Sequence, residues 1–135
     1  MTEHTYVIPG RVYSKKNSKI ITRVGKGSAA KYVALPSTAY RAWEKEVRKI
    51  MAGVKPLSGP LAVRAIIYYK GNRPDLSGAL ESIGDCFEGI LWENDGQIES
   101  WDGSRLIYDG KNPRIVVRVA PWRGENTGKK EDQLD

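Results

Sequence analysis

Four carboxylates in the middle of the chain have the type and spacing needed to hold a divalent metal ion. Glu81 and Asp85 are four residues apart, Asp75 precedes them, and Asp95 follows in the segment WENDGQI. Carboxylate oxygens are the ligands that Mg²⁺ prefers, and bound Mg²⁺ activates water for phosphodiester hydrolysis. Each residue alone also fits an ordinary role, as a helix cap, a surface glutamate or a turn. Their combination predicts metal-dependent phosphodiester hydrolysis.

The sequence holds few residues that could support other catalytic chemistries. The chain has one cysteine, Cys86, and one histidine, His4. A single cysteine excludes a disulfide within the chain and a cysteine-rich zinc module. The lone histidine near the N-terminus argues against histidine-dependent triads and multi-histidine metal sites. No apolar run approaches the roughly 18 residues that span a bilayer, and no secretory signal is visible, so we expect a cytoplasmic protein without membrane contacts.

Charge is unevenly distributed along the 135 residues, whose formal net charge is +6. Residues 1–60 hold twelve Lys and Arg against three Glu, whereas residues 75–109 hold nine acids against one Arg. A basic protein favours an anionic partner such as DNA, but carboxylates repel phosphate. An acidic centre is useful there if a divalent cation lies between carboxylate and phosphate. The alternative is a solvated acidic helix on a basic protein.

Hydrophobic periodicity predicts the elements that position these carboxylates. We expect a domain over residues 1–123 and a disordered polar tail over 124–135. The order β-α-β-α-β-β predicts an α+β fold in which two main helices pack on a small mixed sheet. Strands are expected over 4–9, 20–24, 61–69, 97–101, 105–108 and 114–120, with a hairpin turn at Asp102-Gly103, and helices over 39–51 and 76–89.

The central stretch RPDLSGALESIGDCFEGILWENDGQI resembles the core motif of the RusA family of Holliday junction endodeoxyribonucleases, found in bacteria and their phages. The N-terminal IPGRVYSKKNSK is similar to the opening strand and the Lys/Asn-rich segment of that family. The resemblance implies a RusA-like fold and cleavage of four-way junctions or other branched DNA by paired nicks, in recombination and repair. It also implies dependence on Mg²⁺, with Mn²⁺ as a substitute, and no organic cofactor.

Matching the motif residue by residue assigns three acids and exposes four departures. Asp75, Asp85 and Asp95 stand at acidic positions of the family, so the resemblance implies that Asp75 and Asp95 bind the metal. The departures are Ser77 for a second Asp, Gly78 for Asn, Glu81 for Lys and Asn94 for the first Asp of the loop.

Two interpretations follow from these departures. In the first, Glu81 supplies the lost metal ligand and Asp85 supports it, which preserves catalysis. In the second, the protein has lost cleavage and keeps only binding to DNA junctions. The gain of one acid beside the loss of another favours the first.

Basic residues in the N-terminal part are the candidates for contacts with DNA. Lys15, Lys16, Asn17 and Lys19 form the best phosphate-binding stretch, and Arg73 stands beside the acidic motif. The resemblance further implies a homodimer, whose two-fold symmetry would match that of a four-way junction. The apolar residues near the motif are candidates either for that interface or for the core: Ile90, Leu91, Trp92 and Trp101.

Overall fold

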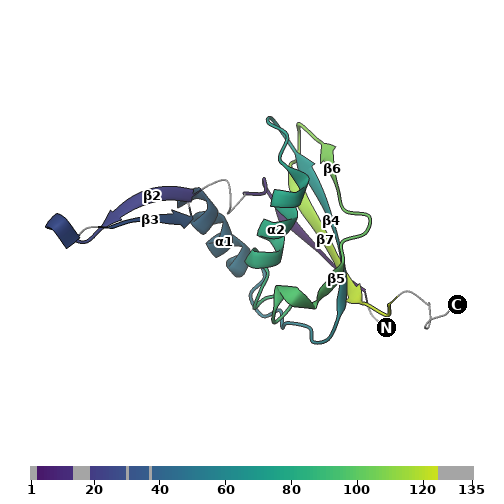
Figure 1. The fold of residues 1–135 in the computed structure, drawn as a ribbon. Helices are drawn as coiled ribbons and strands as arrows, with labels where there is room; N and C mark the ends of the chain where they lie inside the picture. The colour runs from purple at the N-terminus through teal and green to yellow at the C-terminus, as the bar shows by residue number, and fades with distance from the viewer. Residues whose placement is uncertain (1–2, 14–18, 30, 37, 125–135) are drawn as a thin grey trace, which may run out of the picture.

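A mixed five-stranded sheet forms one layer of the protein, and two helices cover one of its faces (Figure 1). This arrangement comes from a computed structural model that describes residues 3–13, 19–29, 31–36 and 38–124, with only the backbone at 19–24, 29 and 31–36. The elements of the sheet and its helices are β1 (His4–Pro9), α1 (Thr38–Ile50), β4 (Leu61–Tyr69), α2 (Leu76–Cys86), β5 (Ile98–Ser100), β6 (Arg105–Tyr108) and β7 (Arg114–Pro121). The predicted α+β class, its mixed sheet and its two main helices are confirmed.

The strand order corrects one prediction from the sequence. β1 pairs antiparallel with β7, and β7 pairs antiparallel with β4, but β5 and β6 both run parallel to β4. β5 pairs with the start of β4 and β6 with its end, so the two lie in succession along one edge and do not form the predicted hairpin. Between them the hydroxyl of Ser104 accepts a hydrogen bond from the backbone N–H of Ala65 at 2.9 Å. The turn at Asp102-Gly103 therefore interrupts an edge strand, and the chain continues along β4.

A second, two-stranded sheet extends from the body as an arm (Figure 1). It consists of β2 (Lys19–Val24) and β3 (Lys31–Pro36), which pair antiparallel, and the turn between them contains a short 3-10 helix, Gly27–Ala29. The sequence predicts β2, but the pattern of residues 31–36 does not by itself identify β3 as a strand. The pairing with β2 supplies the backbone hydrogen bonds that a short strand needs.

The core lies between the two helices and the sheet. Each helix presents a narrow apolar stripe to β4 and β7, whose alternate residues point toward it. Side chains with almost no exposed surface include Tyr40, Val47, Leu61, Val63, Ile67, Ile83, Phe87, Ile115 and Val117. Burying an aliphatic or aromatic side chain of this size contributes about 1.5–3 kcal/mol. Ile50, which the periodicity of α1 assigns to the apolar face, is 42% exposed at the end of that helix.

The end of α2 determines where the acidic residues lie. The helix stops at Cys86, three residues earlier than predicted, and Phe87 caps it. Gly89 adopts a φ of 85°, a left-handed conformation that favours glycine, and its N–H donates to the carbonyl of Trp92 at 2.7 Å. The chain therefore turns sharply here and returns along the helix.

The apolar residues after this turn belong to the core. Ile90, Leu91 and Trp92 are all buried, which corrects the alternative that placed them in a subunit interface. Trp101 packs against the same core and is only partly buried. No helix in the described part of the chain is both long and apolar enough to cross a membrane.

Candidate active site

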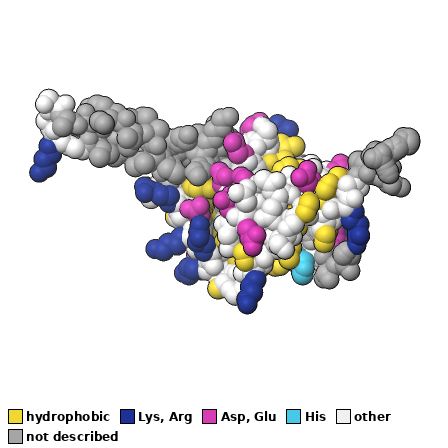
Figure 2. Space-filling view, turned by 60° about the horizontal axis from the view of Figure 1, so that its bottom comes forward, with side chains coloured by type: hydrophobic (Ala, Val, Ile, Leu, Met, Phe, Trp, Pro, Cys, Tyr) yellow, Lys and Arg dark blue, Asp and Glu magenta, His cyan; other side chains and the backbone are white. Residues whose placement is uncertain are grey.

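Charged side chains of both signs lie on the described surface, and some of the basic ones have no acidic partner there. Figure 2 shows several Lys and Arg side chains on the side toward the arm and others at the opposite edge, with Asp and Glu across the middle of the same face. On α1, Lys49 approaches Glu46 and Arg48 approaches Glu44, both at 3.9 Å, whereas Arg41 and Lys45 have no ion pair among the described residues. Elsewhere on the described surface, basic and acidic side chains also pair, Arg114 with Asp109 at 3.0 Å and Arg118 with Glu3 at 2.8 Å.

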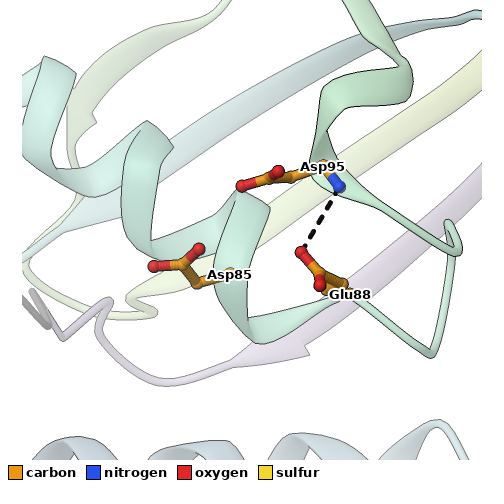
Figure 3. A group of neighbouring side chains, drawn as sticks. All are labelled: Asp85, Glu88 and Asp95. Atoms are coloured by element: carbon orange, nitrogen blue, oxygen red, sulfur yellow. Dashed lines mark hydrogen bonds between the residues drawn. The ribbon is translucent and has the colours of Figure 1, made fainter.

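Three carboxylates converge beside the end of α2 (Figure 3). Asp85 lies in the last turn of the helix, Glu88 follows the cap, and Asp95 begins a short 3-10 helix, Asp95–Gln97. One oxygen from each side chain lies within 4.8 Å of the others. The backbone N–H of Asp95 also donates to Oε1 of Glu88, at 3.3 Å. We call these three residues the carboxylate cluster.

The chemistry of the carboxylate cluster suits a hard divalent cation. All three groups offer oxygen, the donor that Mg²⁺ and Mn²⁺ prefer. Oxygens on opposite sides of one Mg²⁺ ion are about 4.2 Å apart, because each lies about 2.1 Å from the metal. Adjacent ligands on such an ion are closer, about 3.0 Å apart. The three oxygens of the cluster lie within 4.8 Å of one another, so side-chain rotations that shorten these distances would bring them onto one ion.

Close packing of the loop against α2 brings Asp95 to the helix. Gly84 has no side chain, and a Cβ atom there would lie 3.7 Å from Cβ of Asp95 and 3.9 Å from the ring of Trp101. The indole N–H of Trp92 donates to the carbonyl of Gly84 at 3.0 Å, and its ring is fully buried. The loop therefore rests on the helix backbone itself.

Gln97 holds the loop that carries Asp95. Its side-chain oxygen accepts from the backbone N–H groups of Glu93 and Asn94, each at 2.8 Å. Its side-chain nitrogen donates to the carbonyls of Leu57 at 3.0 Å and Gly59 at 2.8 Å. One amide thus closes the loop on itself and ties it to the segment before β4.

Replacing Gln97 by Glu is expected to lower the free energy of unfolding by about 1–3 kcal/mol, because a carboxylate cannot donate to the two carbonyls and both hydrogen bonds are lost. Urea unfolding measures the change. The control is Glu93→Gln, which changes an exposed side chain of the same loop and keeps the backbone N–H. Equal stability of Gln97→Glu and the parent protein would contradict this role.

Asp75 caps the start of α2. Its Oδ2 accepts from the backbone N–H of Gly78 at 2.9 Å and from the hydroxyl of Ser77 at 3.0 Å. With a rise of 1.5 Å per residue, ten residues of helix separate Asp75 from Asp85 by about 15 Å. Within the described residues, Asp75 lies outside the carboxylate cluster, as does the exposed Glu81. The structure thus brings Asp85 and Asp95 together and places Asp75 at the other end of the helix.

Two departures from the family motif have structural partners. Ser77 replaces an acid and donates to the carboxylate of Asp75, so it removes a like-charge repulsion at the helix start. Asn94 replaces an aspartate and caps the short 3-10 helix by accepting from Gly96 N–H at 2.7 Å.

Glu88 was not among the residues selected from the sequence. The available signal was its spacing, since residues three apart on a helix are neighbours and Asp85 stands three before it. Cys86, between them, is not a candidate ligand: burial, and next the charge of Glu44, raise the pKa of its thiol to about 12. The thiol therefore stays neutral and takes no part as a nucleophile or metal ligand.

Of the predicted DNA contacts, Lys15, Lys16 and Asn17 lie outside the described residues. Lys19 begins β2 in the arm, where only the backbone is described. Arg73 is exposed and lines a cavity at the start of α2.

A chain with this α+β fold, a cluster of oxygen ligands and a basic surface has the features of a nuclease. The family model for endodeoxyribonuclease RusA matches residues 9–120, from the end of β1 into β7. The chain therefore belongs to the RusA family, whose members are endodeoxyribonucleases that resolve Holliday junctions. None of the curated proteins matches it.

Proposed function

We propose that this protein is a Mg²⁺-dependent, structure-selective endonuclease that resolves four-way junctions or other branched DNA by paired nicks, acting in the cytoplasm of a bacterial or phage-infected cell. The observation that carries the proposal is the carboxylate cluster at the end of α2, in a basic chain that belongs to the RusA family. Three converging carboxylates repel one another and gain from a shared cation.

In this proposal Asp85, Glu88 and Asp95 hold Mg²⁺, and Mn²⁺ substitutes for it. A divalent ion bound there supplies positive charge beside the phosphate and increases the acidity of water. The protein side contributes orientation: Gln97 and Trp92 fix the loop, so that Asp95 faces the two acids of the helix end. The only histidine, His4, lies on β1 beside Tyr6 and is not part of the carboxylate cluster.

That Asp75 and Glu81 also serve catalysis stays a prediction, and Asp75→Asn tests it without removing the helix cap. Asparagine caps helices about as well as aspartate, so the variant should keep the melting temperature while it loses the charge. A fall in nicking rate at unchanged stability would assign Asp75 a chemical role. Unchanged nicking would restrict Asp75 to the capping seen in the structure.

Contacts with phosphates are expected to come from the N-terminal basic segment and the arm. Replacing both Lys15 and Lys16 by Ala should reduce the slope of log affinity against log salt concentration by about 2, since each phosphate contact contributes about 0.9. The control replaces Lys55 and Lys111, two exposed lysines outside this segment. An unchanged slope in the Lys15/Lys16 variant would remove both residues from the interface.

We further propose a homodimer, which places one site on each of two opposing strands of a junction. A two-fold dimer matches the approximate two-fold symmetry of a four-way junction and explains paired nicks. Sedimentation of the protein with and without junction DNA measures the oligomeric state. A monomer bound to one junction would contradict the proposal.

An end-labelled synthetic four-way junction tests the function as a whole. We expect symmetric nicks in Mg²⁺ or Mn²⁺ and none in EDTA. Tight, junction-selective binding without nicks at any concentration of either metal would instead support the second candidate, a junction-binding protein that has lost cleavage. The departures from the family motif at Ser77 and Glu81 are the observation that supports this second candidate.

A further inference from the structure

A cavity of about 400 Å³ lies at the start of α2, at the opposite end of the helix from the carboxylate cluster. Its walls come from the segment after β1, from the loop between β4 and α2, and from the first turns of α2. These segments are distant in sequence, so the cavity exists only in the folded chain. A ligand pocket typically measures about 300–1,000 Å³, which is far more than one metal ion requires.

Three cations surround this cavity without an acidic partner. Arg11, Lys70 and Arg73 are exposed, and none of them forms an ion pair with a described residue. The one carboxylate in the lining, Asp75, has Oδ2 directed at the helix backbone and the Ser77 hydroxyl. The cavity is therefore positive and suits an anion such as a phosphate group.

Two aromatic rings give the same cavity an apolar surface. Tyr13 and Tyr69 are both partly buried, and both are fixed by neighbouring rings. Tyr13 packs at 6.0 Å from the ring of Trp43, and the guanidinium of Arg11 lies over its ring, 5.0 Å from the centroid. Tyr69 meets Tyr108 edge-on at 5.6 Å. Rings that are already held in place lose little conformational freedom when a flat ligand stacks on them.

We propose that this cavity takes one unstacked nucleotide of branched DNA, with its phosphates beside the cations and its base against the ring of Tyr69. Phosphate and base together account for both parts of the lining, which neither a free phosphate nor an apolar ligand does. An unpaired or strained base at a branch point costs least to unstack, so the cavity favours a junction over a continuous duplex. Asn72 supplies an amide that can hydrogen-bond to the edge of the base.

The distance between the cavity and the carboxylate cluster indicates where this nucleotide lies relative to the cleaved phosphate. The two sites are about 15 Å apart along α2. A strand that spans this distance would place the captured nucleotide a few positions from the phosphate at the carboxylates. The cavity would thus set where the protein cuts relative to the branch. This last step rests on the proposed function, whereas binding of the nucleotide does not.

Binding in EDTA, where cleavage is absent, tests the proposal separately from the nuclease activity. Tyr69→Ala should lower affinity for a four-way junction at least about fivefold. This loss corresponds to the lower limit of the free energy that stacking of one base on an aromatic ring contributes. Affinity for a linear duplex should stay within about twofold, and Tyr69→Phe should restore junction binding because it keeps the ring. Tyr68→Ala is the matched control, since Tyr68 is the adjacent residue on β4 and points to the opposite face.

A fluorescent base at the branch point gives a second measurement on the unaltered protein. We expect the emission of 2-aminopurine at the branch to change on binding, and that of 2-aminopurine within an arm of the junction to stay constant. The proposal would be overturned if Tyr69→Ala lost junction and duplex binding equally, or if it lost neither. An unchanged signal at the branch would also overturn it. Binding of a free mononucleotide as tight as that of the junction would also overturn it.

Discussion

Asp95→Asn is expected to lower the rate of junction nicking at saturating DNA and fixed Mg²⁺ by at least about a hundredfold, because even indirect partners of a metal contribute 10–100-fold and Asp95 would touch the ion directly. Asn keeps the size and one oxygen of the side chain, so the fold is preserved. The backbone N–H of Asp95, which donates to Glu88, is also unchanged. The effect therefore reports on the loss of the charge and of one carboxylate oxygen.

Junction affinity in EDTA should not fall in this variant, since a carboxylate repels phosphate and its charge is removed. Raising the Mg²⁺ concentration should recover part of the rate, which is the signature of weakened metal binding. Glu93→Gln, an exposed acid two residues earlier in the same loop, is the control and should nick at the parental rate. Parental activity in Asp95→Asn would contradict the proposed site.

Trp92→Ala is expected to lower the free energy of unfolding by about 3–5 kcal/mol, the usual cost of truncating a buried large aromatic side chain. Its ring is fully buried, packs against Phe87 at 6.1 Å and meets Trp101 edge-on at 6.5 Å. The substitution also removes the donor to the carbonyl of Gly84. Urea unfolding followed by circular dichroism measures the loss.

Trp92→Phe separates packing from hydrogen bonding at the same position. It keeps an aromatic ring and loses the indole N–H, so we expect a cost of about 1–3 kcal/mol, clearly below that of Trp92→Ala. Because Trp92 joins the loop to α2, nicking should decline in both variants in the same order. Equal stability of Trp92→Ala and the parent protein would contradict the role of this residue in the core.

The elements nearest the site were largely predictable because their patterns are local. β4 matches its predicted bounds at both ends, and α2 starts where its cap and apolar stripe indicate. The helix ends early because Gly89 supports a left-handed turn, and a glycine does not reveal from sequence whether it is used in that way. Periodicity also does not tell which strands pair, which is why β5 and β6 were expected to form a hairpin.

The site itself was predictable only in part, because it is assembled from separate segments. Asp85 and Asp95 were selected from the motif, and the structure places them together. Glu88 joins them only because the loop returns along the helix, which depends on the tertiary contacts of Trp92 and Gln97. The cavity at the start of α2 has the same origin, since it combines the segment after β1 with the loop after β4.

Direct binding of Mn²⁺, followed through the electron paramagnetic resonance signal of the free ion, is the most immediate test of the carboxylate cluster. We expect the parent protein to remove Mn²⁺ from solution without DNA, and excess Mg²⁺ to displace it. A variant with Asp85→Asn, Glu88→Gln and Asp95→Asn should leave the free signal intact, whereas Glu93→Gln with Glu99→Gln should bind as the parent does. Equal Mn²⁺ binding by the triple variant and the parent would show that the metal lies elsewhere.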